Sequence, residues 1–160
     1  MMEKMGFGGG CHWCTEAVFQ SIEGVGNVDQ GWIASSGKYS SFSEAVLVDF
    51  DPQIISLHQL IKSHLLTHSC TSEHSMREKY RSAIYVFSHE QHEIVQKNLE
   101  DLQQLWSGNI ITQILPFVSF RRNSADLLNY YQSRPDAPFC QKYIQPKLKL
   151  LKKNQKADKG

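Results

Sequence analysis

The apolar residues of this chain change their spacing several times, and this change constrains the fold more than any other feature. Residues 42–50 read FSEAVLVDF and alternate with a period of two, which predicts a strand with Glu44 and Val46 on the same face. Residues 56–66 and 89–106 repeat at helical spacing and predict amphipathic helices. The other predicted strands are residues 3–8, 28–34, 82–87 and 110–120, the last broken by Pro116, and further helices are expected to start at Cys11, Ser124 and Gln141.

Because strands and helices follow one another irregularly, the sequence predicts an α+β fold. We expect a two-layer domain in which helices pack on a mixed β-sheet of ferredoxin-like (plait) type, with a long irregular C-terminal part. A length of 160 residues suits one catalytic domain, residues 1–153, followed by a basic, frayed tail at residues 154–160. The lysines from Lys147 to Lys159 are explained by a solvated helix end.

The overall charge excludes little by itself but argues against two kinds of partner. The formal net charge is +1, so neither nucleic acid nor a membrane surface is indicated. No apolar run reaches the ~20 residues that cross a bilayer, and the first residues contain no hydrophobic segment of signal-peptide length. We therefore expect a cytoplasmic protein whose four cysteines stay reduced rather than forming a disulfide framework.

Two of the four cysteines stand where a helix is expected to begin. Residues 8–14 read GGGCHWC, so Cys11 follows three glycines and Cys14 follows one helical turn later. Free N–H groups and the macrodipole at a helix N-terminus favour a thiolate, and glycines allow the backbone to approach a substrate closely. Cys11 is therefore a candidate nucleophile.

The spacing of Cys11 and Cys14 has two interpretations. In a redox motif the second sulfur resolves the oxidised first sulfur, whereas in a zinc site the pair supplies two of four ligands. The candidates for the other two ligands are His68, Cys70 and His74, whose spacing fits no standard zinc pattern well. Otherwise Cys70 is expected to be a buried, unreactive thiol.

Several segments together resemble the peptide methionine sulfoxide reductases of the A type. The residues around Cys11, GCHWCTE, are similar to the family's signature Gly-Cys-Phe-Trp-Gly, which is often followed by x-Glu. Five further segments are similar to family motifs and follow in the same order: SFSEAVLVDFDP at 41–52, HSCT at 68–71, KYRSAIY at 79–85, TQILP at 112–116 and APFCQKYIQPKL at 137–148. Each match is short, but in combination they cover most of the chain.

The resemblance implies a reaction and most of its residues. It implies an enzyme that reduces the S epimer of methionine sulfoxide, free or in proteins, through a sulfenic acid on Cys11 and an intramolecular disulfide. It also implies thioredoxin as the reductant, with no cofactor and no metal. The matched positions make Glu44 the acidic residue, Tyr80 an active-site tyrosine and Cys140 the C-terminal resolving cysteine. A glutamate in a poorly hydrated site suits proton donation to the sulfoxide oxygen.

The chain also departs from the family pattern, as a divergent branch would. His12 replaces a phenylalanine, Trp32 replaces a tyrosine, and Ser75 replaces an aspartate. Residues 125–128, ADLL, stand where the family has Asp-Tyr-His-Gln. These differences leave the preferred substrate and the efficiency of the reaction open.

The predicted substrate site therefore includes three ring side chains. Trp13 is expected to wall the methyl group and the sulfur, because sulfur packs well against aromatic rings. His12 could donate a hydrogen bond to the oxygen, lower the pKa of Cys11 when protonated, or point into solvent. Trp32 either enlarges the apolar wall or has a packing role. Glu16 either braces the site through hydrogen bonds or caps a helix turn.

Resolution of the sulfenic acid has two candidates, which the sequence does not rank. Cys14 lies one helical turn from Cys11, and Cys140 is expected in a mobile loop bounded by Pro135 and Pro138. Two other functions compete with the reductase. One is a thioredoxin-like thiol–disulfide oxidoreductase that uses the CxxC motif directly on disulfides, and the other is a zinc-stabilised binding module without turnover.

Overall fold

The computed structural model describes residues 2–72, 77 and 79–159, with side chains as far as residue 153. Six strands form one sheet in the order β5-β4-β1-β3-β2-β6. The strands are β1 (Glu3–Gly8), β2 (Val25–Ala34), β3 (Ser43–Phe50), β4 (Ala83–Val86), β5 (Gln113–Pro116) and β6 (Ser119–Arg122). The helices are α1 (His12–Gln20), α2 (Leu57–Leu66), α3 (His89–Gln103), α4 (Tyr130–Ser133) and α5 (Gln145–Lys159), with short turns at Gly37–Tyr39 and Ala125–Leu127 and a π-helical turn at Cys140–Ile144.

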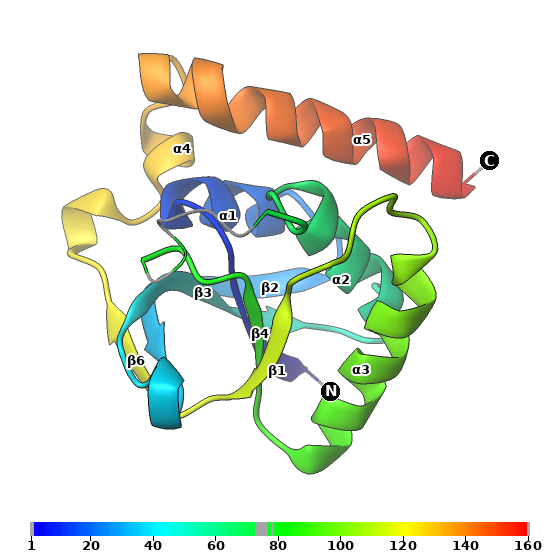
Figure 1. Ribbon diagram of the computed structural model, residues 1–160. Helices are drawn as coiled ribbons and strands as arrows, with labels where there is room; N and C mark the ends of the chain where they lie inside the picture. Colours follow the sequence, from blue (N-terminus) through cyan, green and yellow to red (C-terminus); the bar gives the residue numbers. More distant parts are fainter. Residues whose placement is uncertain (1, 73–76, 78, 160) are drawn as a thin grey trace.

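Helices cover one face of a curled sheet, and α5 lies across the outside of α1 (Figure 1). The main apolar core lies between that face and α1, α2 and α3, and includes Phe7, Val46, Phe19, Leu60 and Val95. The opposite face carries a smaller buried cluster, including Ala45 and Leu47 of β3. The alternation of β3 thus separates two cores, as its period of two predicts.

The prediction of an α+β domain with a mixed sheet is confirmed. All strand pairs are antiparallel except β4 with β5, which is parallel. Within the sheet the central strands have the order β4-β1-β3-β2, and β5 and β6 extend the sheet at its two edges. None of the helices in the described part of the chain is long and apolar enough to cross a bilayer.

One prediction about the second half of the chain was wrong. Residues 110–120 are not one interrupted strand, because β5 and β6 lie on opposite edges of the sheet. Between them the chain crosses the end of the sheet, where the N–H of Phe117 donates to Val86 O and the N–H of Val118 donates to Ala34 O. The last helix, expected from Gln141, is present as the π-helical turn at Cys140–Ile144 and α5, which follows it directly. The predicted tail boundary at residue 153 remains a prediction.

Candidate active site

Cys11 lies between the glycine loop and the first helix. Strand β1 ends at Gly8, and Cys11 is the N-cap residue of α1. Gly9 has φ = +154°, and a Cβ there would collide with the ring of His68. Gly10, in contrast, faces nearly open space, with only the Lys147 Nζ at 4.0 Å from a Cβ placed there. The need for glycine therefore comes from the close packing of Gly9 against His68.

The surroundings of Cys11 favour its thiolate. Its pKa is lowered from 9.0 to about 4, mainly because the Cys14 thiol donates a hydrogen bond to it. His12 and the backbone N–H of Trp13 lower this pKa further, against the opposing effect of burial. The same hydrogen bond, together with burial, raises the pKa of Cys14. The pair therefore consists of a thiolate at Cys11 and a protonated thiol at Cys14.

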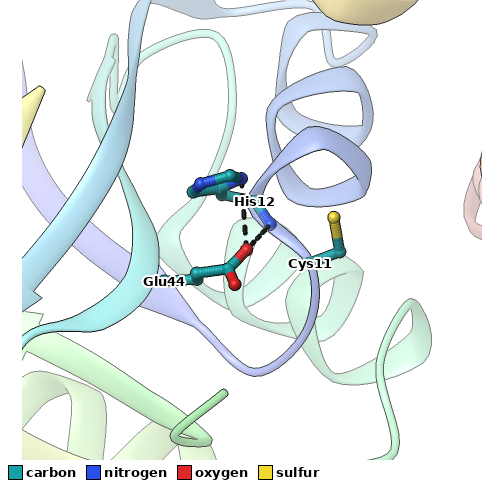
Figure 2. A group of neighbouring side chains, drawn as sticks. All are labelled: Cys11, His12 and Glu44. Atoms are coloured by element: carbon teal, nitrogen blue, oxygen red, sulfur yellow. Dashed lines mark hydrogen bonds and ion pairs between the residues drawn. The ribbon is translucent and has the colours of Figure 1, made fainter. Parts of the chain in front are cut away.

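Glu44 reaches the first turn of α1 from the beginning of β3 (Figure 2). Its Oε1 accepts a hydrogen bond of 3.2 Å from the backbone N–H of His12 and lies 3.2 Å from His12 Nδ1. Its Oε2 lies 3.6 Å from Lys79 Nζ. Glu44 and His12 are only 5% and 6% exposed. The prediction of a poorly hydrated glutamate is thus right about burial, but polar groups rather than apolar ones surround the carboxylate.

His12 does not point into solvent, which removes one of its three predicted roles. Its Nε2 lies 3.4 Å from Asn123 Nδ2, and the edge of its ring meets Trp32 with 5.1 Å between ring centroids. Trp32 is positioned by the pairing of β2 with β3, in which it lies directly opposite Glu44. Trp32 therefore packs beside the His12–Glu44 pair.

A cavity of about 550 Å³ opens at Cys11. Its lining consists of Gly9, Gly10, Cys11, Cys14, Leu66, Thr67, His68, Ser69, Tyr80, Phe139, Tyr143 and Lys147. Tyr80 thus lies where the prediction put it, in the same cavity as the candidate nucleophile. Trp13 is outside this lining, because it stacks on Tyr130 at 4.2 Å and meets the edge of Phe139 at 5.3 Å. Its role as a substrate wall remains a prediction.

The third cysteine of the site is buried beneath the second. Cys140 is fully buried and packs in one cluster with Cys14, Ala17 and Ile144, with Cys11 at its border. The prediction that Cys140 sits in a mobile loop was wrong, because Cys140 begins the π-helical turn and that turn packs on α1. The helical turn and the buried environment both restrict the motion of its side chain.

Glu16 has the bracing role rather than the capping one. Its carboxylate accepts hydrogen bonds from the backbone N–H groups of Asn129 and Tyr130, at 2.9 and 3.1 Å. Burial raises the pKa of Glu16, and the two backbone donors act against that rise. Asn129 has a left-handed backbone with φ = +56°. Glu16 therefore fixes the turn that places Tyr130 on Trp13.

Sequence reasoning missed the side of the cavity that the C-terminal region lines. Phe139, Tyr143 and Lys147 all come from the C-terminal helical region. Lys147 was assigned to a solvated helix end, but its Nζ donates a hydrogen bond of 2.6 Å to Thr67 O. Their spacing could have revealed two of them, because Tyr143 and Lys147 come three and seven positions after Cys140 and therefore lie on the same side of a helix.

The zinc interpretation finds little support in the positions of its candidate ligands. Both ring nitrogens of His68 are engaged, one with His64 O and the other with Ser82 Oγ at 2.8 Å. Cys70 is buried, as predicted for an unreactive thiol, and burial raises its pKa. His74 and Ser75 lie outside the described residues. Within the described part of the chain, one other group has metal-binding potential: the donor atoms of Cys11, His12 and Glu44 lie within 4.8 Å of one another.

Comparisons with known proteins agree on one group of relatives. The sequence profile of the family described as "Peptide methionine sulfoxide reductase" matches residues 3–160. A curated relative from Rhodopirellula baltica, "Peptide methionine sulfoxide reductase MsrA 1", is 33% identical over 160 residues, which are 91% of this chain and 83% of the relative. The crystal structure of Mxr1 from Saccharomyces cerevisiae in reduced form has a TM-score of 0.76 at 21% identity, covering 87% of this chain and 89% of that one. The crystal structure of the same yeast protein in complex with Trx2 has a TM-score of 0.64 at 21% identity, covering 81% and 84% of the two chains.

Proposed function

This chain belongs to the peptide methionine sulfoxide reductase family, and from that premise we propose how its residues carry out thiol-dependent reduction of methionine sulfoxide. Cys11 is the nucleophile, Glu44 the proton donor, and Tyr80 a hydrogen-bond donor to the sulfoxide oxygen. The observation that carries this assignment is the low pKa of Cys11, about 4, at the opening of a cavity that Tyr80 also lines. A thiolate in reach of a substrate cavity is what sulfoxide chemistry requires.

The first step transfers oxygen and two electrons. The Cys11 thiolate attacks the sulfoxide sulfur while the Glu44 carboxyl gives its proton to the sulfoxide oxygen. The S–O bond of the substrate and the new bond between the two sulfurs then break as the hydroxyl group passes to the Cys11 sulfur, so methionine leaves with its sulfur reduced by two electrons and Cys11 becomes a sulfenic acid. One proton is consumed in this step, so Glu44 must regain one before the next turnover.

Cys14 resolves the sulfenic acid first, and Cys140 acts second. Cys14 is the thiol hydrogen-bonded to Cys11, whereas Cys140 packs against Cys14 in the buried cluster. Attack of Cys14 on the sulfenic sulfur releases water and forms the disulfide between Cys11 and Cys14. Exchange with Cys140 then frees Cys11, and thioredoxin reduces the remaining disulfide. The similarity to the yeast protein crystallised with Trx2 supports this choice of reductant.

The substrate is the S epimer of methionine sulfoxide, free or in proteins. Phe139 and Tyr143 supply aromatic surface in the cavity beside Cys11. Trp13 and Trp32 are the proposed substrate-binding side chains, whereas His12 contacts Glu44. For Trp13 this assignment rests on its match to the family signature, and none of the three side chains lines the cavity beside Cys11 in the described chain.

Two further expectations, the ferredoxin-like type of the sheet and the cytoplasmic location, also remain proposals. The central strand order β4-β1-β3-β2, with α1 and α2 as connections, supports a ferredoxin-like topology for the middle of the sheet. The free state of Cys11, Cys14, Cys70 and Cys140 suits a reducing compartment such as the cytoplasm.

The decisive experiment is methionine release from the two separated sulfoxide epimers with a thiol reductant. We expect turnover of the S epimer only, and a loss of roughly 10²-fold or more in Glu44→Gln, the size of a general-acid contribution. The thioredoxin-like alternative requires no proton donor to oxygen, so it predicts disulfide reduction that survives Glu44→Gln. Turnover of both epimers at equal rates, or methionine release that persists in Cys11→Ser, would disprove the proposal.

A further inference from the structure

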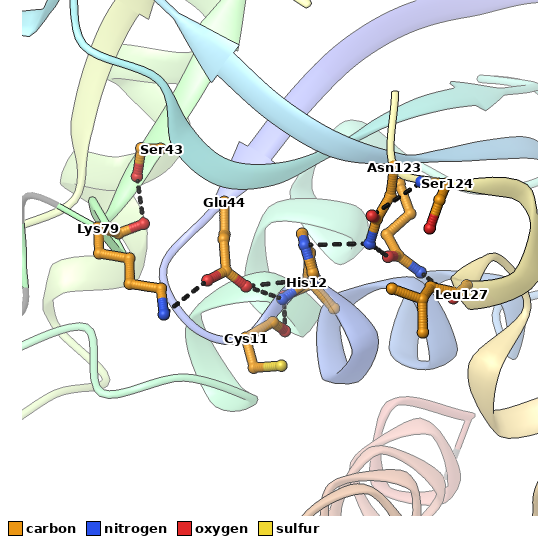
Figure 3. A network of polar contacts seen from close by, with 10 residues as sticks. Cys11, His12, Ser43, Glu44, Lys79, Asn123, Ser124 and Leu127 are labelled. Carbon is orange, nitrogen blue, oxygen red and sulfur yellow. Dashed lines mark hydrogen bonds and ion pairs between the residues drawn. The ribbon is translucent and has the colours of Figure 1, made fainter. Parts of the chain in front are cut away.

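A chain of side-chain amides leads from the backbone at Leu127 to the ring of His12 (Figure 3). Gln30 Nε2 donates a hydrogen bond of 3.2 Å to Leu127 O, and Gln30 Oε1 accepts one of 2.6 Å from Asn123 Nδ2. Asn123 Oδ1 accepts a bond of 2.8 Å from the N–H of Ser124. A carbonyl oxygen only accepts and a backbone N–H only donates, so each end of this chain fixes the orientation of the amide beside it.

These orientations determine which atom of Asn123 faces the ring of His12. With Asn123 Oδ1 turned to Ser124, the amide nitrogen of Asn123 faces His12 Nε2 at 3.4 Å. An amide nitrogen can only donate, so Nε2 must accept and cannot carry a proton. A neutral imidazole has one N–H, and in His12 it is therefore on Nδ1.

The Nδ1 atom is directed at Glu44. It lies 3.2 Å from Glu44 Oε1, although off the line of a straight hydrogen bond, and it has no hydrogen-bond partner of good geometry in the described part of the chain. An unprotonated Nδ1 there would oppose one lone pair with another, in a site where both residues are about 95% buried. A straight hydrogen bond from Nδ1–H to Oε1 therefore requires the ring to rotate from its position in the structure.

We propose that His12 is a positioning residue, held as the Nδ1-protonated neutral tautomer by Gln30 and Asn123, and that it binds Oε1 of Glu44 so that the transferable proton of Glu44 sits on Oε2. The backbone N–H of His12 donates to Oε1, and Nδ1 lies 3.2 Å from the same oxygen, where the aligned ring would donate a second hydrogen bond. A proton on Oε1 would face both of these donors. Oε2 has only Lys79 Nζ at 3.6 Å among its described contacts, and Lys79 is 57% exposed and able to move away. The inference rests on the proposed role of Glu44 as proton donor.

This role explains a departure from the family pattern. The family has phenylalanine where this chain has His12, and a phenyl ring has no hydrogen bond to offer Glu44. A packing role for His12 would make ring shape the only important property. The positioning role makes a donor at the Nδ1 position important, which distinguishes the two explanations experimentally.

Three substitutions of His12 separate donor position from ring shape. Phenylalanine keeps the ring, glutamine places its amide nitrogen near the position of Nε2, and asparagine places it near the position of Nδ1. We expect kcat for the S epimer to fall about 10- to 100-fold in His12→Phe with little change in KM, the size of one hydrogen bond to a charged group. His12→Asn should recover most of this loss and His12→Gln should not. His58→Phe, on the exposed side of α2, is the control and should match the unmodified chain.

A double-mutant cycle tests whether His12 acts through Glu44. In the Glu44→Gln background, His12→Phe should cause no further loss, because the group that it positions has gone. An equal fold-loss in both backgrounds would overturn the proposal, as would full activity of His12→Phe in the unmodified background. Neither outcome affects the proposed function, which is tested separately by epimer selectivity and by the loss of methionine release in Cys11→Ser.

The tautomer is measurable without any activity. Two-dimensional ¹⁵N–¹H NMR of the imidazole rings distinguishes protonated Nδ1 from protonated Nε2, and His12→Phe identifies the His12 signals by their disappearance. We expect Nδ1 to be the protonated nitrogen in the unmodified chain, and Asn123→Ala to reduce this preference. A neutral ring protonated mainly on Nε2 would overturn the proposal even if the substitutions lower activity.

Discussion

Replacing Cys14 with alanine should move the pH at which Cys11 begins to react, because the Cys14 thiol is the main cause of the low pKa of Cys11. At pH 6, a thiol with a pKa of about 4 is about 99% ionised, whereas one with the reference value of 9.0 is about 0.1% ionised. The alanine variant should therefore lose most of its thiolate at this pH. Serine keeps a hydroxyl donor, so Cys14→Ser is the matched control and should retain much of the effect.

The rate at a single pH is a poor measure of this change. A more basic thiolate is intrinsically a better nucleophile, with a Brønsted coefficient of about 0.4–0.5 for attack on disulfides. Applied to alkylation, a pKa about five units higher raises intrinsic reactivity about 10²-fold, which offsets most of the about 10³-fold loss of thiolate at pH 6. The net difference in rate is then only about tenfold. The informative quantity is therefore the midpoint of the pH profile.

The assay follows alkylation of Cys11 by iodoacetamide between about pH 3 and pH 9, with the Cys11 peptide quantified by mass spectrometry. Cys70 and Cys140 are buried and serve as slowly reacting internal references. The unmodified chain should reach a plateau above a midpoint near pH 4, whereas the rate of Cys14→Ala should still be rising at about pH 8. A midpoint near that of a free thiol in the unmodified chain, or equal midpoints in the unmodified chain and Cys14→Ala, would refute the reasoning.

Three further predictions concern the proposed resolving thiols, the stability of the fold at acidic pH, and the hydrogen bonds from Glu16 to the turn at Asn129 and Tyr130. With one equivalent of sulfoxide, Cys140→Ser should still form the disulfide between Cys11 and Cys14, whereas Cys14→Ser should accumulate sulfenic acid, as trapping with dimedone and mass spectrometry would show. Burial lowers the pKa of His68 from 6.5 to about 4, so the unfolded state binds the proton first as the pH falls. His68 should therefore contribute a decrease of up to about 1.4 kcal/mol per pH unit to the free energy of unfolding between about pH 6.5 and 4, beside the contributions of Cys11 and His64, whose pKa values are also lowered. Urea denaturation of the unmodified chain and of His68→Gln isolates this contribution, and an equal decrease in both would contradict the burial of a neutral His68. Glu16→Ala removes the charged acceptor of two part-buried backbone N–H groups and should lower stability by about 1–3 kcal/mol, with Glu16→Gln losing less in the same denaturation experiment.

Local sequence pattern was enough to predict the elements that carry the proposed nucleophile, Cys11, and the proposed proton donor, Glu44. The helix start at Cys11 and the alternation of β3 depend on neighbours in the sequence, and both were found as predicted. The order of the edge strands was not predictable in this way, because the hydrogen bonds that separate β5 from β6 join Phe117 and Val118 to distant strands. Cys140 was misplaced for a related reason, since prolines at 135 and 138 indicate a loop but say nothing of the packing of the next turn on α1.

The residues around the site were even less accessible to sequence reasoning. The contacts of His12 with Asn123 and of Glu16 with Asn129 each span more than 100 residues of sequence. The periodicity of a short stretch of sequence cannot predict such pairs. Lys147 illustrates the limit best, because its charge suggested solvent, whereas its long side chain allows the amine to reach the Thr67 carbonyl.

The hydrogen bond between the two first-turn cysteines gives the reaction an order. While Cys11 is a thiolate, it accepts a hydrogen bond from the Cys14 thiol, and this bond is the largest cause of the raised pKa of Cys14. Conversion of Cys11 to a sulfenic acid removes that thiolate and with it the main obstacle to ionisation of Cys14. Burial still opposes ionisation, but Lys147 favours it and is the largest of the causes that lower this pKa. In the proposed mechanism, the Cys14 thiol is therefore kept unreactive until Cys11 has been oxidised, which is the sequence of events that a sulfenic acid intermediate requires.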